Sequence, residues 1–343
     1  MGLTSQAVKE MALRAGADLC GIGSMDRFEG APKEMDPRYL FPEAKTVVGM
    51  VFRIPRGVQR GIEEGTQFYQ YPSLAYGGIN EIYAPAVLYR VGQLIEDAGY
   101  EAMIYRNTGA RGCISDMDGS PGNSLSPEEQ IEVMNQAKRK TDHHRSVQFS
   151  RAARPGQVPP DLQFHFRLAA VASGLGEIGW SKMFLTEEFG PSQRWGFILT
   201  DAELEPDPEV KPHLCDRCGD CIRACPGHAL TEKGLNRWQC AAYYVGANRS
   251  KNPFMPPDAF EGDSDRLAVI AGEADLSPER AREIIDQIHF YPPNKHAYPA
   301  SICGRACDTA CYIHLEQLDL LTKKYLTPFR KRPEWKLSLD GDK

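Results

Sequence analysis

The sequence predicts a layered α/β domain over residues 1–205, followed by a smaller cysteine-rich domain over residues 206–343. Helix and strand patterns alternate along the first part, and eight of the ten cysteines lie after residue 214. The chain has 343 residues, of which 42% are hydrophobic, enough to fill the core of one large or two medium domains.

The α/β prediction comes from the order of its elements. The stretch "TSQAVKEMALRAG" has an apolar helical face, Thr4 or Ser5 as its N-cap and Gly16 as its stop. Short buried strands are predicted in "ADLCGIG" and "KTVVGMVF". A helix from Pro85 to Gly99 precedes the strand "YEAMIY", and a second helix in "LQFHFRLAAVASGLG" precedes "WGFILTD". This alternation favours a sheet covered by helices.

A polar insertion interrupts the α/β pattern at about residues 106–160. We expect one helix in it, because Ser126, Pro127 and Glu129 form a capping box. Asp142, His143 and His144 could ligate a metal, although a solvated turn is the favoured interpretation. A further capped helix is predicted to begin at Ser277 and Pro278, between the two groups of cysteines.

Cysteine spacing indicates metal clusters in the second domain. Thiols stay reduced in a cytoplasm, so a disulfide framework is not expected there. Four cysteines and a proline form the run C-x2-C-x2-C-x3-C-P, in which three thiolates bind one [4Fe–4S] cube and the fourth binds a neighbouring cube. Zinc ribbons instead pair two C-x2-C knuckles across a longer spacer, which makes zinc the weaker alternative. The run consists of Cys215, Cys218, Cys221, Cys225 and Pro226.

Two cubes need eight thiolates, and this half of the chain supplies eight. We therefore predict a ferredoxin-like domain with two [4Fe–4S] clusters and a C-terminal tail. Cys20 and Cys113 stand apart and are interpreted as ordinary small residues. The predicted ligands of the first cluster are Cys215, Cys218, Cys221 and Cys311, and those of the second are Cys225, Cys240, Cys303 and Cys307.

Charge and hydropathy limit the function classes. The net charge of −6 and the isoelectric point near 5.8 give no general field that would attract nucleic acid or an anionic membrane. No stretch reaches the roughly 18 apolar residues of a membrane span. The first residues contain no basic segment followed by an apolar one, so we expect a cytoplasmic protein.

The stretch "LAAVASGLGEIGWSKMFLTEEFGPSQRWGFILTDAELEPD", which runs into the cysteines, resembles the core of the corrinoid iron–sulfur reductases. This superfamily includes epoxyqueuosine reductase and the reductive dehalogenases. The preceding "IYAPAVLYRVGQLIEDAGYEAMIY" is similar to the segment before that core in the dehalogenases. Together with the cysteines, the resemblance covers most of residues 75–311.

The resemblance implies base-off cobalamin bound in a nitroreductase-like α/β domain, with one cluster beside it. The glycines of "SGLGEIG" would let a bulky ligand approach the backbone, although an ordinary helix stop explains them too. No Asp-x-His-x-x-Gly motif is present, since Val147 stands where its glycine would fall after Asp142 and His144. The expected cobalamin contacts are Gly174, Gly176, Glu177, Gly179, Phe189, Gly190 and Arg194.

Two departures weaken the tRNA-modifying interpretation. The epoxyqueuosine enzymes carry an aspartate in a "VDT…P" segment, whereas Asp161 here lies in "QVPPDLQFHF". We also expect none of the C-terminal helical repeat of those enzymes. The basic tail "KKYLTPFRKRPEWK" could touch phosphate, but a solvated tail is the favoured interpretation.

We therefore expect a cytoplasmic reductase that passes electrons through two clusters to cobalamin and removes a halide or oxygen leaving group from a small molecule. Its electrons would come from a low-potential donor such as ferredoxin or flavodoxin, and nucleic acid is not an expected partner. The alternatives are an electron-transfer or corrinoid-activating protein without a substrate of its own, and an epoxyqueuosine-type enzyme that acts on tRNA.

Reductive removal of a leaving group also needs a proton donor and a positive charge. The resemblance implies a tyrosine donor beside a basic residue. The candidates are Tyr76 and Tyr83 as donors, which flank "GGINEI", and Arg194 as the cation. Each has a structural alternative, since Tyr83 fits a helix core and Arg194 could pair with Glu187 or Glu188.

Overall fold

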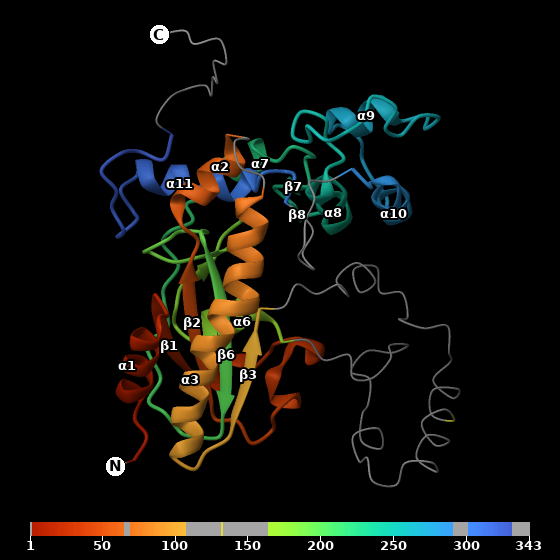
Figure 1. Ribbon diagram of the computed structural model, residues 1–343. Helices are drawn as coiled ribbons and strands as arrows, with labels where there is room; N and C mark the ends of the chain where they lie inside the picture. The colour runs from red at the N-terminus through yellow and green to blue at the C-terminus, as the bar shows by residue number, and fades with distance from the viewer. Residues whose placement is uncertain (1, 65–68, 108–131, 133–163, 291–300, 331–343) are drawn as a thin grey trace.

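The computed structural model describes residues 2–64, 69–107, 132, 164–290 and 301–330 (Figure 1). The elements up to residue 106 are α1 (Ser5–Ala15), β1 (Leu19–Ser24), the short 3₁₀ turns η1 (Met25–Phe28), η2 (Lys33–Met35) and η3 (Pro37–Tyr39), β2 (Thr46–Arg53), α2 (Arg56–Glu63), η4 (Tyr71–Tyr83), α3 (Ala84–Asp97) and β3 (Ala102–Arg106). Those after residue 163 are α6 (Phe166–Ala172), β4 (Glu177–Ile178), β5 (Phe184–Leu185), β6 (Gln193–Thr200), α7 (Asp220–Arg223), β7 (Leu230–Thr231), β8 (Gly234–Leu235), α8 (Arg237–Val245), α9 (Arg266–Ala271), α10 (Pro278–Gln287) and α11 (Ala306–Gln317).

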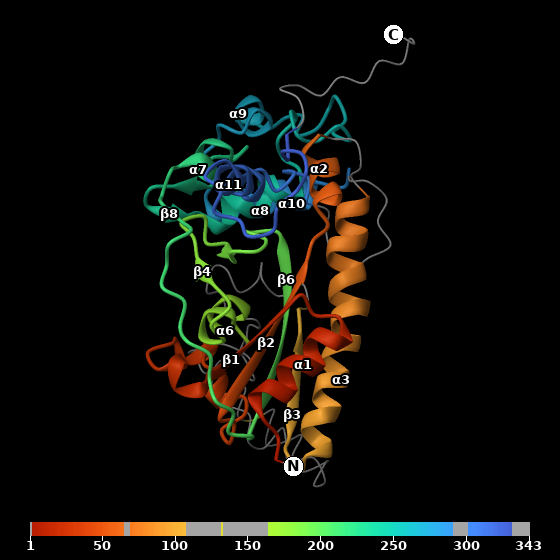
Figure 2. The same cartoon turned by 90° about the vertical axis from the view of Figure 1, so that its left-hand side faces the viewer.

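The main sheet has the strand order β1-β2-β6-β3, and all neighbouring strands are antiparallel. Side chains of β2 alternate between its two faces, as the pleat requires. Val48 and Met50 join the core formed with α1 and α3, whereas Val47 and Val51 join the core formed with α6. Figure 2 shows α1 and α3 on one side of the sheet and α6 on the other. Burial on both faces explains the unbroken apolar runs of β2 and β6, and the predicted mixed α/β architecture is confirmed.

The N-terminal helix has the predicted ends. The Thr4 side chain accepts a hydrogen bond from the backbone N–H of Ala7, so Thr4 is the N-cap. Gly16 ends the helix with φ at +118°, a conformation that favours glycine. Val8 and Ala12 are the buried members of the predicted apolar face.

A wide helical segment, η4, leads into α3 and was not expected from the sequence. Its thirteen residues adopt a π-helix, and the N–H of Ala84 at its end donates to the carbonyl of Ile79, five residues back. Segments of this kind are rare and concentrate at functional sites. η4 places Tyr71 and Tyr76 beside β6 and the cysteine-rich half of the chain.

The cysteine-rich half lies at one end of the sheet, where Figure 1 shows α7 and α11 next to α2, with α8, α9 and α10 farther to the right. The side chain of Ser277 caps α10 by accepting from the N–H of Arg280, as predicted. The last described segment packs back on the α/β part, because Arg56 of α2 pairs with Glu316 of α11 and donates to the carbonyl of Thr327. The boundary between residues 205 and 206 stays a prediction.

Several predictions lie outside the described residues. These concern nearly all of the insertion at 106–160, and also the tail beyond residue 330. The residues concerned are Cys113, Ser126, Pro127, Glu129, Asp142, His143, His144, Val147 and Asp161.

Candidate functional site

Four thiols line one pocket at the junction of α7 and α11: Cys215, Cys218, Cys221 and Cys311, here called the first thiol group. Burial raises the pKa of Cys221, and the neighbouring Cys218 and Cys215 raise it further. Burial also raises the pKa of Cys311, where Asp308 and the other three thiols add to the effect. The structure therefore brings together the four cysteines that the sequence assigned to one cluster.

The second thiol group is Cys225, Cys240, Cys303 and Cys307. Burial raises the pKa of Cys240 to about 12, with Cys303 and Cys225 adding to the effect. The pKa of Cys307 lies well above its ordinary value, because of burial first and Asp308 next, with Cys303 and Cys240 contributing. Four thiolates repel one another unless a cation lies among them, so both groups fit metal centres. None of the nine described cysteines forms a disulfide.

Glu177 supports the first thiol group from β4. Its carboxylate is almost fully buried and accepts hydrogen bonds from the backbone N–H groups of Leu214 at 3.0 Å and Cys215 at 2.9 Å. A third bond comes from the N–H of His213. The N–H of Trp180, just beyond β4, lies 3.2 Å from the Cys215 sulfur. Glu177, predicted as a cobalamin contact, thus holds the loop that carries the first cysteine.

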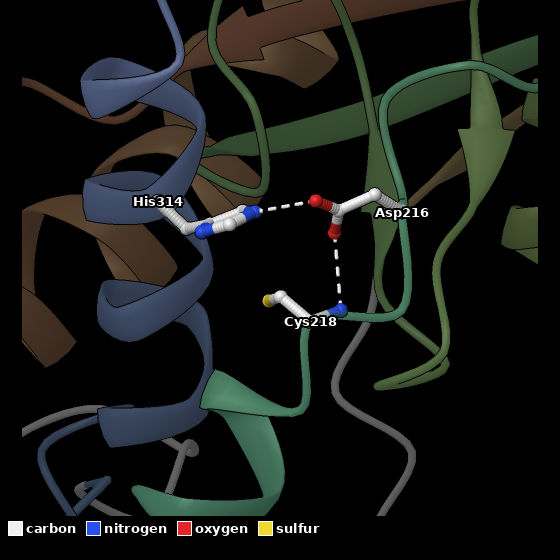
Figure 3. A group of neighbouring side chains, drawn as sticks. All are labelled: Asp216, Cys218 and His314. Atoms are coloured by element: carbon white, nitrogen blue, oxygen red, sulfur yellow. Dashed lines mark hydrogen bonds and ion pairs between the residues drawn. The ribbon is translucent and has the colours of Figure 1, made fainter.

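An acid and a histidine flank Cys218 in the same group (Figure 3). The Asp216 carboxylate accepts from the N–H of Cys218 at 3.0 Å and from His314 Nε2 at 2.9 Å. The hydrogen bond from His314 is the main reason that the pKa of Asp216 is lowered. These three residues could together hold a metal ion, but the Cys218 thiol belongs to the first thiol group. Asp216 and His314 therefore hold the loop that carries Cys218 against α11.

The second candidate centre joins Tyr76 of η4 to Arg194 of β6. The Arg194 guanidinium carbon lies 3.8 Å from the centroid of the Tyr76 ring. Its Nε donates to the carbonyl of Ala75 at 2.8 Å, and it lies over the Tyr71 ring as well. Arg194 is only 5% exposed. Among the described residues no carboxylate pairs with it, which excludes the alternative partners Glu187 and Glu188.

Tyr76 is an unusually acidic tyrosine. Burial raises its pKa, but the charges of Arg194 and Arg305 and the hydrogen bonds with Ser301 and Tyr244 outweigh burial and lower the pKa to about 8. The pKa of Tyr244 lies well above its ordinary value because of burial. Of this hydroxyl pair, Tyr76 therefore ionises first. A lowered pKa in a buried, cationic site is typical of groups that transfer protons.

Arg305 connects this centre to the second thiol group. It stands between Cys303 and Cys307 in the sequence, and its guanidinium forms a double hydrogen bond with the buried Asp308, one bond being 2.7 Å. Its charge also lowers the pKa of Tyr76. One arginine thus acts electrostatically on both centres.

Tyr83 lies elsewhere. Its hydroxyl donates to the carbonyl of Gly16 at 3.0 Å, its ring meets Phe52 edge-on, and 48% of the residue is exposed. The structure brings Tyr76 and Arg194 together but places Tyr83 in the packing between α1 and the start of α3. Its predicted catalytic role stays a prediction that these contacts do not support.

The glycines predicted to approach cobalamin are instead approached by their own chain. A Cβ on Gly176 would lie 2.0 Å from the carbonyl oxygen of Leu185, and one on Gly174 would lie 2.6 Å from that of Pro208. On Gly179 the nearest atom would be in the Leu185 side chain, at 3.0 Å. Gly176 and Gly179 are therefore needed by the β4–β5 hairpin, and Gly174, with φ of +69°, by its approach to Pro208. A cobalamin contact at these glycines stays a prediction.

The two remaining predicted contacts form a turn before β6. Gly190 adopts φ of +54° and exchanges backbone hydrogen bonds with Thr186. Phe189 is buried in the core beside α6. Both have structural explanations, so a ligand contact at either residue stays a prediction.

Sequence reasoning missed Tyr244, Ser301 and Arg305. Each had a local signal, because Tyr244 follows Cys240 by one helical turn and the other two lie within two residues of Cys303. Their contacts with Tyr76 and Arg194 join segments far apart in the sequence. Only the fold reveals that relationship.

These features define a mixed α/β protein with two groups of four thiols, the second of which lies next to a buried tyrosine–arginine pair. A scan of known protein families finds no match. Sequence comparison finds a tetrachloroethene reductive dehalogenase from Desulfitobacterium hafniense, 35% identical over 28% of this chain and 17% of the relative. It also finds an epoxyqueuosine reductase from Gloeobacter violaceus, 40% identical over 25% of this chain and 27% of the relative.

The predicted resemblance to these two groups of reductases is confirmed by relatives of both kinds. The chain matches less than a third of the length of each relative. Among solved structures, an epoxyqueuosine reductase from Streptococcus thermophilus aligns over 80% of this chain and 69% of its own, with 14% identity and a TM-score of 0.42. A catabolic reductive dehalogenase aligns over 91% of this chain and 36% of its own, with 13% identity and a TM-score of 0.46. No described helix has the length and apolar character of a membrane span.

Proposed function

We propose that the protein is a reductase that passes electrons through two [4Fe–4S] clusters to cobalamin and removes a halide or oxygen leaving group from a small molecule. The observation that carries the proposal is the arrangement of eight free thiols in two groups of four, with the second group next to the Tyr76–Arg194 pair. The relatives described above, which are named reductive dehalogenase and epoxyqueuosine reductase, support the reaction class.

The thiol sets fit the clusters by their chemistry. Soft thiolate ligands in groups of four suit iron–sulfur cubes. The first thiol group would hold the cluster that receives electrons from an external low-potential donor. The second thiol group would hold the cluster nearer to Tyr76, because Cys240 shares α8 with Tyr244 and Ser301 lies two residues before Cys303.

Cobalamin enters the proposal through the resemblance to the corrinoid reductases. Bound cobalamin would supply the reductive cleavage of the bond to the leaving group. The hairpin glycines give no support to this part, since their close contacts are made by the protein itself. The residues that we propose to act on a substrate are Tyr76 and Arg194.

Removal of a halide consumes two electrons and one proton: the carbon–halogen bond breaks, the halide leaves as an anion and a carbon–hydrogen bond forms. In this proposal the Tyr76 hydroxyl gives the proton to carbon and becomes a phenolate. The Arg194 guanidinium, which is buried and has no carboxylate partner among the described residues, stabilises that phenolate. Removal of the oxygen of an epoxide would consume two electrons and two protons: both carbon–oxygen bonds break, an alkene forms and the oxygen leaves as water.

The test is anaerobic reconstitution with iron, sulfide and cobalamin, followed by single-turnover reaction with halogenated and epoxide compounds. We expect tight corrinoid binding and one reduced product per turnover. Intact clusters without corrinoid binding would overturn the proposal and favour the electron-transfer alternative, in which the protein has no substrate of its own.

The epoxyqueuosine-type activity on tRNA is the second candidate. It is favoured by the 40% identical relative, which is named epoxyqueuosine reductase. A gel shift with tRNA distinguishes the two candidates. Salt-sensitive binding, together with loss of the epoxide from modified tRNA, would replace the small-molecule substrate with a nucleic acid.

A further inference from the structure

A second tyrosine touches the candidate proton donor. The hydroxyl oxygens of Tyr76 and Tyr244 are 2.8 Å apart, and the Ser301 hydroxyl lies 3.3 Å from that of Tyr76. Tyr244 comes from α8, one turn after Cys240, so both side chains project from the same helix face. The carbonyl of Tyr244 also accepts from the N–H of Ile302, which fixes the Ser301 segment against α8.

Proton transfer would leave a negative charge on the Tyr76 oxygen in a place with little water. In the part of the chain that the structure describes, the charged and titratable groups near it include Arg194 of β6, Arg305 at the start of α11, Tyr71 of η4 and Tyr244 of α8, with Asp308 behind Arg305. Arg194 lies over the ring, where it meets the π face. Among the described residues, the groups positioned to bond the oxygen itself are the hydroxyls of Tyr244 and Ser301.

We propose that Tyr244 is a positioning residue that donates a hydrogen bond to the Tyr76 oxygen and stabilises its phenolate after the proton has left. This inference rests on the proposed function, because it gives Tyr244 a role through the proton donor of that reaction. Tyr244 suits the role because its own hydroxyl stays protonated when Tyr76 ionises. The bond at 2.8 Å is short enough to strengthen when the acceptor becomes charged.

The chain offers a matched control on the same helix. Tyr243 precedes Tyr244, but its hydroxyl donates to the carbonyl of Val269 at 3.2 Å and its ring is buried in the core formed by α8, α9 and α10. Tyr243→Phe therefore removes one hydroxyl from α8 without touching Tyr76. Tyr244→Phe removes the hydroxyl that contacts it.

The experiment is a titration of tyrosinate absorbance in the near ultraviolet, carried out on cluster-loaded protein with no substrate. Wild type should form one tyrosinate near pH 8, which Tyr76→Phe should abolish. Tyr244→Phe should make this tyrosine about a tenfold weaker acid, moving its midpoint up by about one pH unit, because a hydrogen bond to the charged form is lost. Tyr243→Phe should leave the midpoint in place. The same midpoint in wild type and Tyr244→Phe would overturn the inference.

Two further readouts keep the inference separate from the proposed function. The titration needs no substrate, so a protein that reduces none of the tested compounds refutes the proposed function while the contact between the tyrosines is still measured. In an active protein, the alkaline limb of the rate profile should move with the tyrosinate midpoint. A purely structural role would lower the rate at every pH and leave the limb in place.

If Tyr244→Phe loses its iron, 3-fluorotyrosine at position 244 keeps the shape and strengthens the donor. The Tyr76 midpoint should then move to lower pH. An unchanged midpoint would contradict the role of Tyr244 equally.

Discussion

The guanidinium of Arg194 lies against the face of Tyr76, with 3.8 Å between its central carbon and the ring centroid. The two residues come from β6 and η4 and are 118 positions apart in the sequence. Their contact places a buried positive charge over the ring of Tyr76. A tyrosine held in this way can lose a proton at a lower pH than an ordinary one.

Replacement of Tyr76 by phenylalanine should lower the rate of the chemical step by about 10² to 10⁴-fold, the usual contribution of a general acid. Tyr83→Phe is the matched variant, and we expect its rate to stay within about twofold of wild type, because its hydroxyl bonds Gly16 instead. Single-turnover kinetics with the same substrate checks both. A larger loss in Tyr83→Phe than in Tyr76→Phe would reverse the assignment.

The reaction should be lost at alkaline pH. Tyr76 is active as its protonated form, and its pKa is about 8, below the ordinary value for tyrosine. The rate should therefore be full below pH 8 and fall as the pH rises through that value. Arg194→Gln should move this fall to higher pH, because the charge that favours the phenolate is gone, whereas Arg194→Lys should keep more of the shift. The pH profile of the single-turnover rate is measured for wild type and both variants. The same midpoint in wild type and Arg194→Gln would contradict the effect of Arg194 on the Tyr76 pKa.

Loss of one thiol should remove one cluster. Wild type should contain about eight iron and eight sulfide per chain if each thiol group holds one cube. Cys225→Ala should reduce iron to about half and disturb the neighbouring cluster, because α7 with Cys221 directly precedes Cys225. Cys20→Ala is the control, since Cys20 packs against the sheet core far along the chain from both groups. About four iron together with zinc in wild type would exclude two cubes.

Glu177→Gln should weaken the first cluster selectively. The charged carboxylate accepts three backbone hydrogen bonds ahead of Cys218, and bonds to a charged group contribute about 1.5 to 3 kcal/mol each. Glutamine keeps the shape but offers one acceptor oxygen. We expect faster loss of iron from the first cluster on exposure to a chelator, with the second cluster retained. Glu187→Gln, an exposed carboxylate nearby, should behave as wild type, and equal loss from both clusters would argue against this role.

The parts that the sequence predicted are those encoded locally. Helix ends at Thr4 and Ser277 follow from capping chemistry, and the buried strands follow from unbroken apolar runs. The spacing of the cysteine run supplied the first three thiols of the first group, which share a pocket with Cys311, whereas the assignment of eight ligands to two clusters stays a prediction. The glycines after α6 leave their prediction undecided, since a missing Cβ marks a close approach without telling what approaches.

The contact between Tyr76 and Tyr244 could not be predicted, because it joins residues 168 positions apart through the packing of η4 against α8. The π-helical form of η4 has no simple sequence signature either. Tyr83 lies only seven positions from Tyr76, but its hydroxyl donates to the carbonyl of Gly16. Periodicity alone does not separate the two tyrosines.

The most direct test is a single turnover of reduced, cobalamin-reconstituted protein with halogenated and epoxide compounds. The oxidation of the corrinoid is monitored during the turnover, and the products are analysed afterwards. We expect the corrinoid to bind, two electrons to be consumed per product, and the product to carry hydrogen in place of the halide or, from an epoxide, to be the alkene. Fully loaded clusters that reduce neither bound corrinoid nor any of these compounds would contradict it.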